Sequence, residues 1–234
     1  MAGQRVRFGW WYEAVLLGVV VGVTAALATG HLGGLDLAVR DWCAAHRGAV
    51  AVGVARAFNL LGQGGPLTLI AVGLAGWLAG RRRSVRPLLP VAFVFGALYL
   101  TIGPLKLWSG RPYPREAVDP HPELFFRAVE HDRAFPSGHT ANAVVWLGVI
   151  VLLAGALRRA YGRASVAPRA VAVLRVAAPV IVVATTVYLQ YHWLTDSIVG
   201  LAIGLLLDRL RQRVPWDRVP LPGVPERWRR PALD

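Results

Sequence analysis

The sequence predicts an all-α integral membrane protein, a six-helix bundle with both termini in the cytoplasm. Three observations lead to this fold class. Hydrophobic residues make up 55% of the 234 residues and charged residues only 17%, a balance too apolar for a typical water-soluble domain. Apolar segments of helical length recur along the chain, and clusters of arginine fall in alternate loops between them.

The six apolar segments can each cross a bilayer once flanking residues are included, because a perpendicular span needs about 20 residues. Each is expected to be helical, since the bilayer interior offers no hydrogen-bond partner to an open strand edge. The first resembles a signal peptide, but no clear cleavage site ends it, and we expect an uncleaved span. The approximate bounds are Ala14–Thr29, Pro66–Gly80, Leu88–Ile102, Thr140–Leu157, Val171–Tyr188 and Thr195–Leu207.

The arginines orient these spans, because loops rich in basic residues stay in the cytoplasm. Basic clusters precede the first span, follow the sixth, and join the second to the third and the fourth to the fifth. The loops at residues 30–48 and 105–135 balance basic and acidic residues, so they are predicted to lie outside. Residues 48–64 are expected to form an amphipathic helix at the outer interface. The clusters comprise Arg5, Arg7, Arg81, Arg82, Arg83, Arg86, Arg158, Arg159, Arg163, Arg169, Arg209, Arg211 and Arg213.

This pattern predicts a multi-pass cell-membrane protein with one membrane domain, residues 1–213, and a tail, residues 214–234. The tail is rich in proline and arginine and is expected to be a flexible or surface-bound cytoplasmic segment. The net charge of +13 would suit nucleic-acid binding, but the arginines lie between apolar runs instead of forming one solvent-facing patch. No nucleic-acid partner is therefore expected. The 25 arginines against one lysine are typical of a GC-rich bacterial genome.

Three polar clusters, far apart in the sequence, fall at the outer surface in this topology. The first spans residues 106–115 and follows the third apolar segment. The second spans residues 135–140 and opens the fourth, and the third spans residues 191–196 and opens the sixth. Their convergence on one side of the membrane predicts a shared functional site.

The first two clusters suit an anion. Lys106 and Arg111 supply fixed cations, and a guanidinium matches the geometry of phosphate oxygens. Ser137 and Gly138 open a helix, where free backbone N–H groups and the helix dipole attract negative charge. Taken singly, basic residues at a helix end are more often interfacial residues that snorkel, and a serine there is more often a simple N-cap.

The third cluster suits nucleophilic catalysis. His192 and Asp196 are four residues apart, so they share one face of a helix and can form a hydrogen bond. A carboxylate that holds one imidazole nitrogen protonated leaves the other nitrogen free to attack. His139 supplies a second imidazole that can act as general acid. A metal could use the same residues, but the neighbouring cations would repel it, and no metal is expected.

Together the clusters resemble the type-two phosphatidic acid phosphatase superfamily, integral-membrane lipid phosphatases related to the vanadium haloperoxidases. That family carries a lysine followed by arginine-proline, then Pro-Ser-Gly-His, then Ser-Arg-x5-His-x3-Asp. Here residues 136–139 match the second motif in full, and His192 with Asp196 matches the end of the third. The resemblance covers roughly residues 60–207.

Two positions depart from the family pattern. The strict first motif would place an arginine at position 113, where this chain has Tyr113, and Arg111 follows Lys106 instead. In the third motif Thr186 stands where the family has an arginine. The resemblance then leaves Arg111, Arg115 or Arg133 to compensate, or implies a different substrate or weak activity.

The resemblance implies a phosphohistidine mechanism without metal or cofactor. His192 would attack phosphorus, Asp196 would hold its imidazole, and His139 would protonate the departing lipid oxygen. The remaining predicted site residues would neutralise charge on the phosphate oxygens; these are Lys106, Arg111, Ser137 and Gly138.

The partners implied are the bilayer and a lipid phosphate: a polyprenyl diphosphate, phosphatidate or phosphatidylglycerophosphate. A site on the outer face favours the polyprenyl diphosphate, without deciding among the three. Haloperoxidases share the anion pocket, but they are soluble, and six spans argue against that activity. The alternative from another class is a non-catalytic protein that binds or transports a lipid phosphate with a degenerate phosphatase site.

Overall fold

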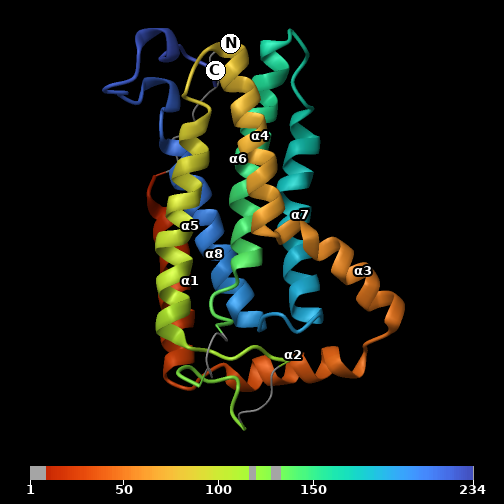
Figure 1. Ribbon diagram of the computed structural model, residues 1–234. Coiled ribbons are helices and arrows are strands. Elements are labelled where there is room, and N and C mark those ends of the chain that lie inside the picture. Colours follow the sequence, from red (N-terminus) through yellow and green to blue (C-terminus); the bar gives the residue numbers. More distant parts are fainter. Residues whose placement is uncertain (1–8, 116–119, 128–132, 234) are drawn as a thin grey trace.

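The computed structural model describes residues 9–115, 120–127 and 133–233, which form eight α-helices (Figure 1). Within these described ranges the β pairing is limited to an isolated bridge between Ser84 and Arg229, so the predicted all-α class is confirmed. The helices are α1 (Trp11–Ala28), α2 (Gly33–Ala45), α3 (Ala49–Asn59), α4 (Gly64–Arg82), α5 (Leu88–Ser109), α6 (Gly138–Ala160), α7 (Pro168–Tyr188) and α8 (Leu194–Arg213).

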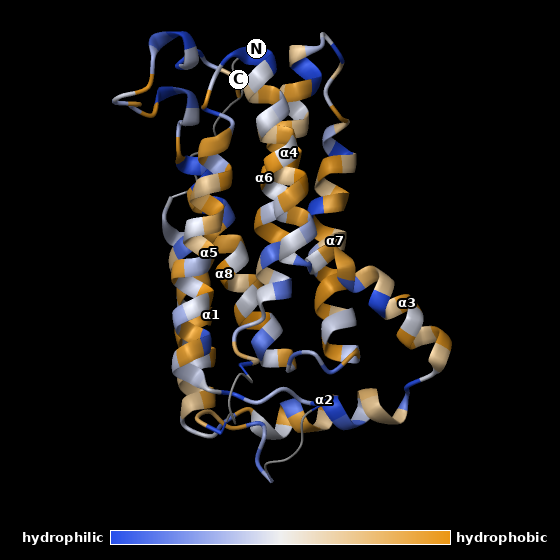
Figure 2. Ribbon diagram, in the orientation of Figure 1, coloured by the Kyte–Doolittle hydropathy of each residue, from blue (hydrophilic) through white to orange (hydrophobic). Residues whose placement is uncertain are grey.

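The long helices run side by side, and α2 lies across one end of the bundle (Figure 1). Four of them, α1, α5, α6 and α7, are long and apolar enough to cross a membrane. α3 and α4 make a fifth candidate if the pair, bent by 43°, forms one span. α8 coincides with the sixth predicted segment but carries charged residues at both ends, and its crossing stays a prediction. Apolar residues dominate the middle of the bundle, and polar residues gather toward both ends (Figure 2).

α6 is the central helix of the bundle. Of its most apolar stretch, 67% is buried against the rest of the protein, compared with 17–28% for α1, α5 and α7. Glycines allow α8 to approach it closely. A Cβ at Gly200 would lie 2.4 Å from the backbone oxygen of Ser137, and one at Gly204 would lie 3.1 Å from that of Ala141. Because only glycine fits at Gly200, the start of α8 lies directly against the start of α6.

The segment predicted as the first outer loop is largely helical. α2 occupies most of residues 30–48, with Gly33, Asp36 and Cys43 buried on one face. These positions recur at helical spacing, as expected of a helix that lies on a surface. α3 then leads into α4 through the bend, which confirms a helix at residues 48–64. Apolar side chains on α3 remain exposed, among them Val50 and Phe58.

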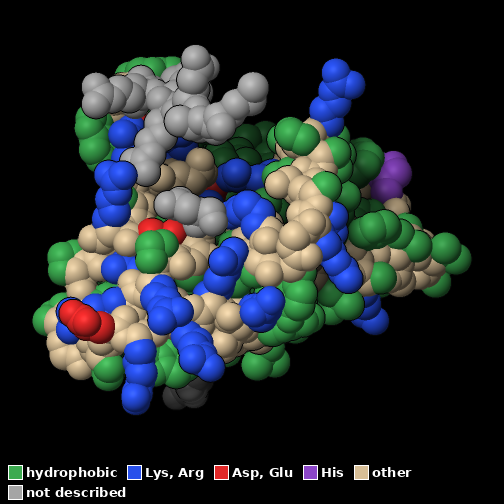
Figure 3. Space-filling view, turned by 90° about the horizontal axis from the view of Figure 1, so that it is seen from above, with side chains coloured by type: hydrophobic (Ala, Val, Ile, Leu, Met, Phe, Trp, Pro, Cys, Tyr) green, Lys and Arg blue, Asp and Glu red, His purple; other side chains and the backbone are tan. Residues whose placement is uncertain are grey.

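Arginines crowd the end of the bundle opposite α2 (Figure 3). The α4–α5 and α6–α7 loops both lie at this end (Figure 1). The carboxylate of Glu13 near the start of α1 pairs with Arg213 at the end of α8 at 2.6 Å, so these two helix ends are also neighbours. The arginine clusters predicted from the sequence therefore lie at one end of the bundle, and α2 lies at the other. Arg5 and Arg7 lie outside the described residues.

The C-terminal tail packs against this arginine-rich end of the bundle. The guanidinium of Arg86 donates hydrogen bonds to three tail carbonyls. The carboxylate of Asp217 accepts from the backbone N–H groups of Ala232 and Leu233, and Leu233 is buried. The carbonyls bound by Arg86 are those of Trp216, Val219 and Arg229.

Candidate active site

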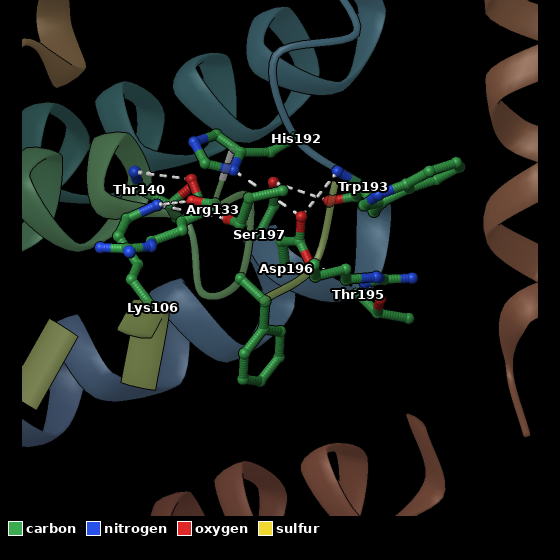
Figure 4. Close-up of polar contacts among 12 residues, drawn as sticks. Lys106, Arg133, Thr140, His192, Trp193, Thr195, Asp196 and Ser197 are labelled. Atoms are coloured by element: carbon green, nitrogen blue, oxygen red, sulfur yellow. Dashed lines mark hydrogen bonds and ion pairs between the residues drawn. The ribbon is translucent and has the colours of Figure 1, made fainter. Parts of the chain in front are cut away.

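The three polar clusters of the sequence come together (Figure 4), at the end of the bundle near α2 (Figure 1). The first follows the C-terminus of α5, the second opens α6 and the third opens α8. A backbone hydrogen bond of 3.0 Å from the Ser137 N–H to the Asp196 carbonyl ties the second cluster to the third. The side chain of Ser109, at the end of α5, donates to the Phe135 carbonyl at 3.1 Å and ties the first cluster to the second.

A cavity of about 340 Å³ forms where the clusters meet. Lys106, Gly138, His139 and His192 line it, so four of the seven predicted site residues share one space. The rings of His139 and His192 are 5.8 Å apart between centroids. The ammonium of Lys106 donates to the backbone carbonyl of Arg133, a few residues before α6 (Figure 4). The cavity therefore combines two imidazoles with a cation, as nucleophilic and acid–base chemistry on an anion requires.

His192, which lines the cavity, faces the buried carboxylate of Asp196. His192 Nδ1 lies 3.7 Å from Asp196 Oδ2, slightly beyond hydrogen-bond distance. Nδ1 is buried and makes no hydrogen bond in the described structure, and Asp196 Oδ2 also accepts from the Trp193 N–H at 3.0 Å. Burial lowers the pKa of His192 below its ordinary value, so the imidazole is neutral near pH 7.

Ser137 serves as the N-cap of α6. Its hydroxyl accepts a hydrogen bond from the Thr140 N–H at 3.3 Å, and its backbone N–H donates to the backbone carbonyl of Asp196. The side chain is fully buried, and Ser137 does not line the cavity. The adjacent Gly138 does line it, at the first position of the helix. Any anion contact at this helix start therefore falls to Gly138 and the residue after it, and the role predicted for the Ser137 backbone is not met.

Arg111 does not line the cavity, although the sequence predicts that it binds phosphate there. Its side chain is fully buried, and its guanidinium contacts two carboxylates, Asp36 and Asp196, each at 2.6 Å. It also donates to Thr195 Oγ1 at 2.9 Å and to the Glu123 carbonyl at 3.0 Å. These partners take the guanidinium away from the cavity, so a phosphate-binding role does not fit this geometry.

The two positions that depart from the family pattern have other uses here. The ring of Tyr113 lies 5.7 Å from that of His192 and lines the cavity. Thr186 is buried, and its hydroxyl accepts from Asn59 Nδ2 at 2.6 Å. Of the arginines that could compensate, Arg115 lies over the rings of Tyr113 and Tyr191, at 5.6 and 5.2 Å. Arg115 is thus next to the site, on its exposed side.

An apolar groove continues from the cavity along the outer surface of the bundle, where Leu69, Phe95 and Tyr99 are exposed. The two spaces share Gly64, Gly65, Gly138 and Asn142 as lining residues. The groove has a volume of about 650 Å³ and runs between α4, α5 and α6. Its remaining walls are mostly apolar and comprise Thr68, Leu69, Phe95, Leu98, Tyr99, Ile102, Gly103 and Trp146. A polar site that opens into an apolar groove suits an amphiphile with a charged head.

The sequence did not point to Asp36 and Thr195, two buried residues that bind the Arg111 guanidinium on the side away from the cavity, next to Asp196. Asp36 is 1% exposed on α2, and Thr195 is 1% exposed at the start of α8. No local pattern marks Asp36, because an acidic residue in a balanced outer loop is ordinary. Across the described ranges, no three His, Cys, Asp or Glu side chains are grouped to hold a metal ion.

The chain is similar to known proteins in both sequence and fold. The sequence pattern of the PAP2 superfamily matches residues 87–220. The fold is similar to the crystal structure of a transmembrane PAP2-type phosphatidylglycerolphosphate phosphatase from Bacillus subtilis, with a TM-score of 0.68 and 25% sequence identity. That match covers 86% of this chain and 94% of the other. No curated protein sequence matches the chain. The match over more than half of the residues, on a shared helical membrane fold, shows that this chain belongs to the PAP2 superfamily.

Proposed function

We propose that the chain is a membrane phosphatase that hydrolyses the phosphoester of a lipid through a phosphohistidine intermediate. The observation that carries this proposal is the cavity in which Lys106, His139 and His192 meet, open to the apolar groove. Family membership and the fold of the Bacillus subtilis phosphatase support lipid phosphatase chemistry. The groove would hold acyl chains while the headgroup enters the cavity.

In the first step His192 attacks phosphorus and the bond from phosphorus to the lipid oxygen breaks. Asp196 faces Nδ1, so Nε2 is the attacking nitrogen and Nδ1 keeps its proton. His139 donates a proton to the departing lipid oxygen, which leaves as an alcohol. Lys106 offsets the negative charge on the phosphoryl oxygens, where electrostatic stabilisation contributes most to phosphoryl transfer.

In the second step water attacks the phosphohistidine. His139, now neutral, accepts a proton from that water, and the bond from phosphorus to Nε2 breaks. Inorganic phosphate leaves, and His192 returns to its neutral form. The same two imidazoles thus act in both steps, and the residues of this chain perform each proton transfer.

The substrate class proposed is a lipid phosphomonoester. Among the described side chains that line the cavity, Lys106 is the one lysine or arginine, and Tyr113 and Thr186 replace two family arginines. A phosphomonoester carries less negative charge than a diphosphate and needs fewer cations to neutralise it. The Bacillus subtilis protein of similar fold is a phosphatidylglycerolphosphate phosphatase, which is consistent with a monoester.

The purified protein in mixed micelles is expected to release inorganic phosphate from phosphatidylglycerophosphate and phosphatidate. Release from a polyprenyl diphosphate should be slower. The measurement is the initial rate of phosphate release for each lipid at matched surface concentration, with a His192→Ala sample as blank. Folded protein that releases phosphate from none of the three would contradict the proposal and favour the binding or transport alternative.

We also propose that the active site faces outward, because arginines crowd the opposite end of the bundle. In a Cys43→Ala background, a Pro120→Cys variant should react with a membrane-impermeant maleimide in intact cells. A Ser165→Cys variant, in the exposed α6–α7 loop, should react only after permeabilisation. Reaction of Ser165→Cys alone in intact cells would invert the topology and place the site in the cytoplasm.

A further inference from the structure

α2 places a buried carboxylate, that of Asp36, next to the guanidinium that binds Asp196. Asp36 is 1% exposed, although many residues of this helix are accessible. Its Oδ2 lies 2.6 Å from Arg111 Nη2, and Arg111 Nη1 lies 2.6 Å from Asp196 Oδ1. One guanidinium therefore bridges two carboxylates that lie on different helices.

The same acid also binds the start of α8. Asp36 Oδ1 accepts from the Thr195 N–H at 3.0 Å, and Oδ2 accepts from the Thr195 hydroxyl at 2.5 Å. Thr195 is the second residue of α8, where backbone N–H groups have no partner inside the helix. Asp36 thus caps α8 from another helix, one residue before Asp196.

The two carboxylate oxygens of Asp196 have different partners. Oδ1 is held by the guanidinium, while Oδ2 accepts from the Trp193 N–H and faces His192 Nδ1. Because the carboxylate is held at both oxygens, by Arg111 and by the Trp193 N–H, it resists rotation and Oδ2 keeps its direction toward the imidazole. The guanidinium itself lies over the ring of Trp193, 5.1 Å from its centroid, which limits its movement further.

We infer that Asp36 is a positioning residue that acts through Arg111 to aim Asp196 at His192. The inference rests on the proposed function, since it assigns a role in the same reaction. Without the Asp36 carboxylate, Arg111 would keep a buried Nη2 with its charged partner missing, and such a donor moves toward a new acceptor. That movement would release Asp196 Oδ1 and turn Oδ2 away from the imidazole.

Asp36→Asn tests this inference, because asparagine keeps the size of the side chain and removes its charge. We expect kcat on a short-chain lipid phosphate to fall about 10- to 100-fold, since small misplacements of catalytic groups have effects of this size. KM should change by less than about 3-fold, because Asp36 lies outside the cavity and the change is in orientation, not in substrate binding. Asp41→Asn, an exposed acid on the same helix, is the matched control and should leave both constants unchanged.

A double variant separates positioning from stability. In an Asp196→Asn background, Asp36→Asn should have little further effect on kcat, because its effect passes through Asp196. Multiplicative losses in the double variant would overturn the inference. So would a kcat in Asp36→Asn that equals wild type once the folded fraction, from thermal unfolding in detergent, is taken into account.

A readout without turnover keeps the inference distinct from the proposed function. In ¹⁵N-histidine spectra, the His192 signals are identified by their loss in His192→Ala. Wild type should show the Nδ1-protonated tautomer, and Asp36→Asn should show a mixture of tautomers, while Asp41→Asn matches wild type. Identical His192 signals in wild type and Asp36→Asn would overturn the positioning role. If no lipid is hydrolysed yet the tautomer shifts, the proposed function fails and the inference stands.

Discussion

His192→Ala is expected to lower kcat/KM for a lipid phosphate by about 10⁴- to 10⁶-fold, the scale seen when a catalytic nucleophile or base is removed. The reason is that no other described imidazole is placed to attack phosphorus with an acid behind it; Asp196 faces His192 Nδ1, not His139. The protein should remain folded, because alanine removes a ring that makes few polar contacts. The measurement is phosphate release together with thermal unfolding in detergent.

The matched control is His46→Ala, an exposed histidine at the end of α2, which should keep wild-type turnover. A second readout uses radiolabelled lipid phosphate and a quench in base, in which phosphohistidine survives. Wild type should carry label and His192→Ala should not. Turnover within about 10-fold of wild type in folded His192→Ala, less than removal of even one general acid or base costs, would eliminate the phosphohistidine mechanism.

Lys106→Met is expected to lower kcat/KM by about 10²- to 10³-fold, the effect of removing one group that stabilises transition-state charge. Methionine keeps the length of the apolar stem and removes the charge. The loss should be large because Tyr113 and Thr186 stand where guanidinium groups are expected, and Thr186 is committed to Asn59. Lys106→Arg should recover part of the activity. The measurement is kcat/KM on one short-chain lipid phosphate.

Arg115→Ala tests whether Arg115 contributes to phosphate binding in addition to Lys106. Arg115 lies over the rings of Tyr113 and Tyr191 on the exposed side of the site, so its removal should cost about 5-fold or less, the range of one exposed charged contact. A loss in Arg115→Ala larger than the loss in Lys106→Met would show that Arg115 is the principal phosphate ligand. The assignment of that role to Lys106 would then be wrong.

The sequence by itself determined the helical membrane class and which segments supply the candidate site residues. Apolar length and arginine asymmetry are local properties, because each helix must satisfy its own backbone hydrogen bonds in lipid. Six predicted segments coincide with α1 and α4–α8, and the motif histidines line one cavity. The same local patterns missed α2, since a short amphipathic helix that lies on the surface resembles a balanced loop.

Only the tertiary structure decided which charges meet. Arg111 and Asp36 are 75 residues apart in sequence, and Thr186 and Asn59 are 127 apart, so no spacing rule could pair them. From its motif Arg111 was expected to bind phosphate, but burial makes a guanidinium bind the carboxylates that surround it. The packing of α8 against α6 at Gly200 and the placement of α2 across the end of the bundle create those surroundings. The sequence therefore determines which charged side chains are available. Packing decides which of them reach the cavity, because the burial and the ion-pair partners of a side chain depend on the whole fold.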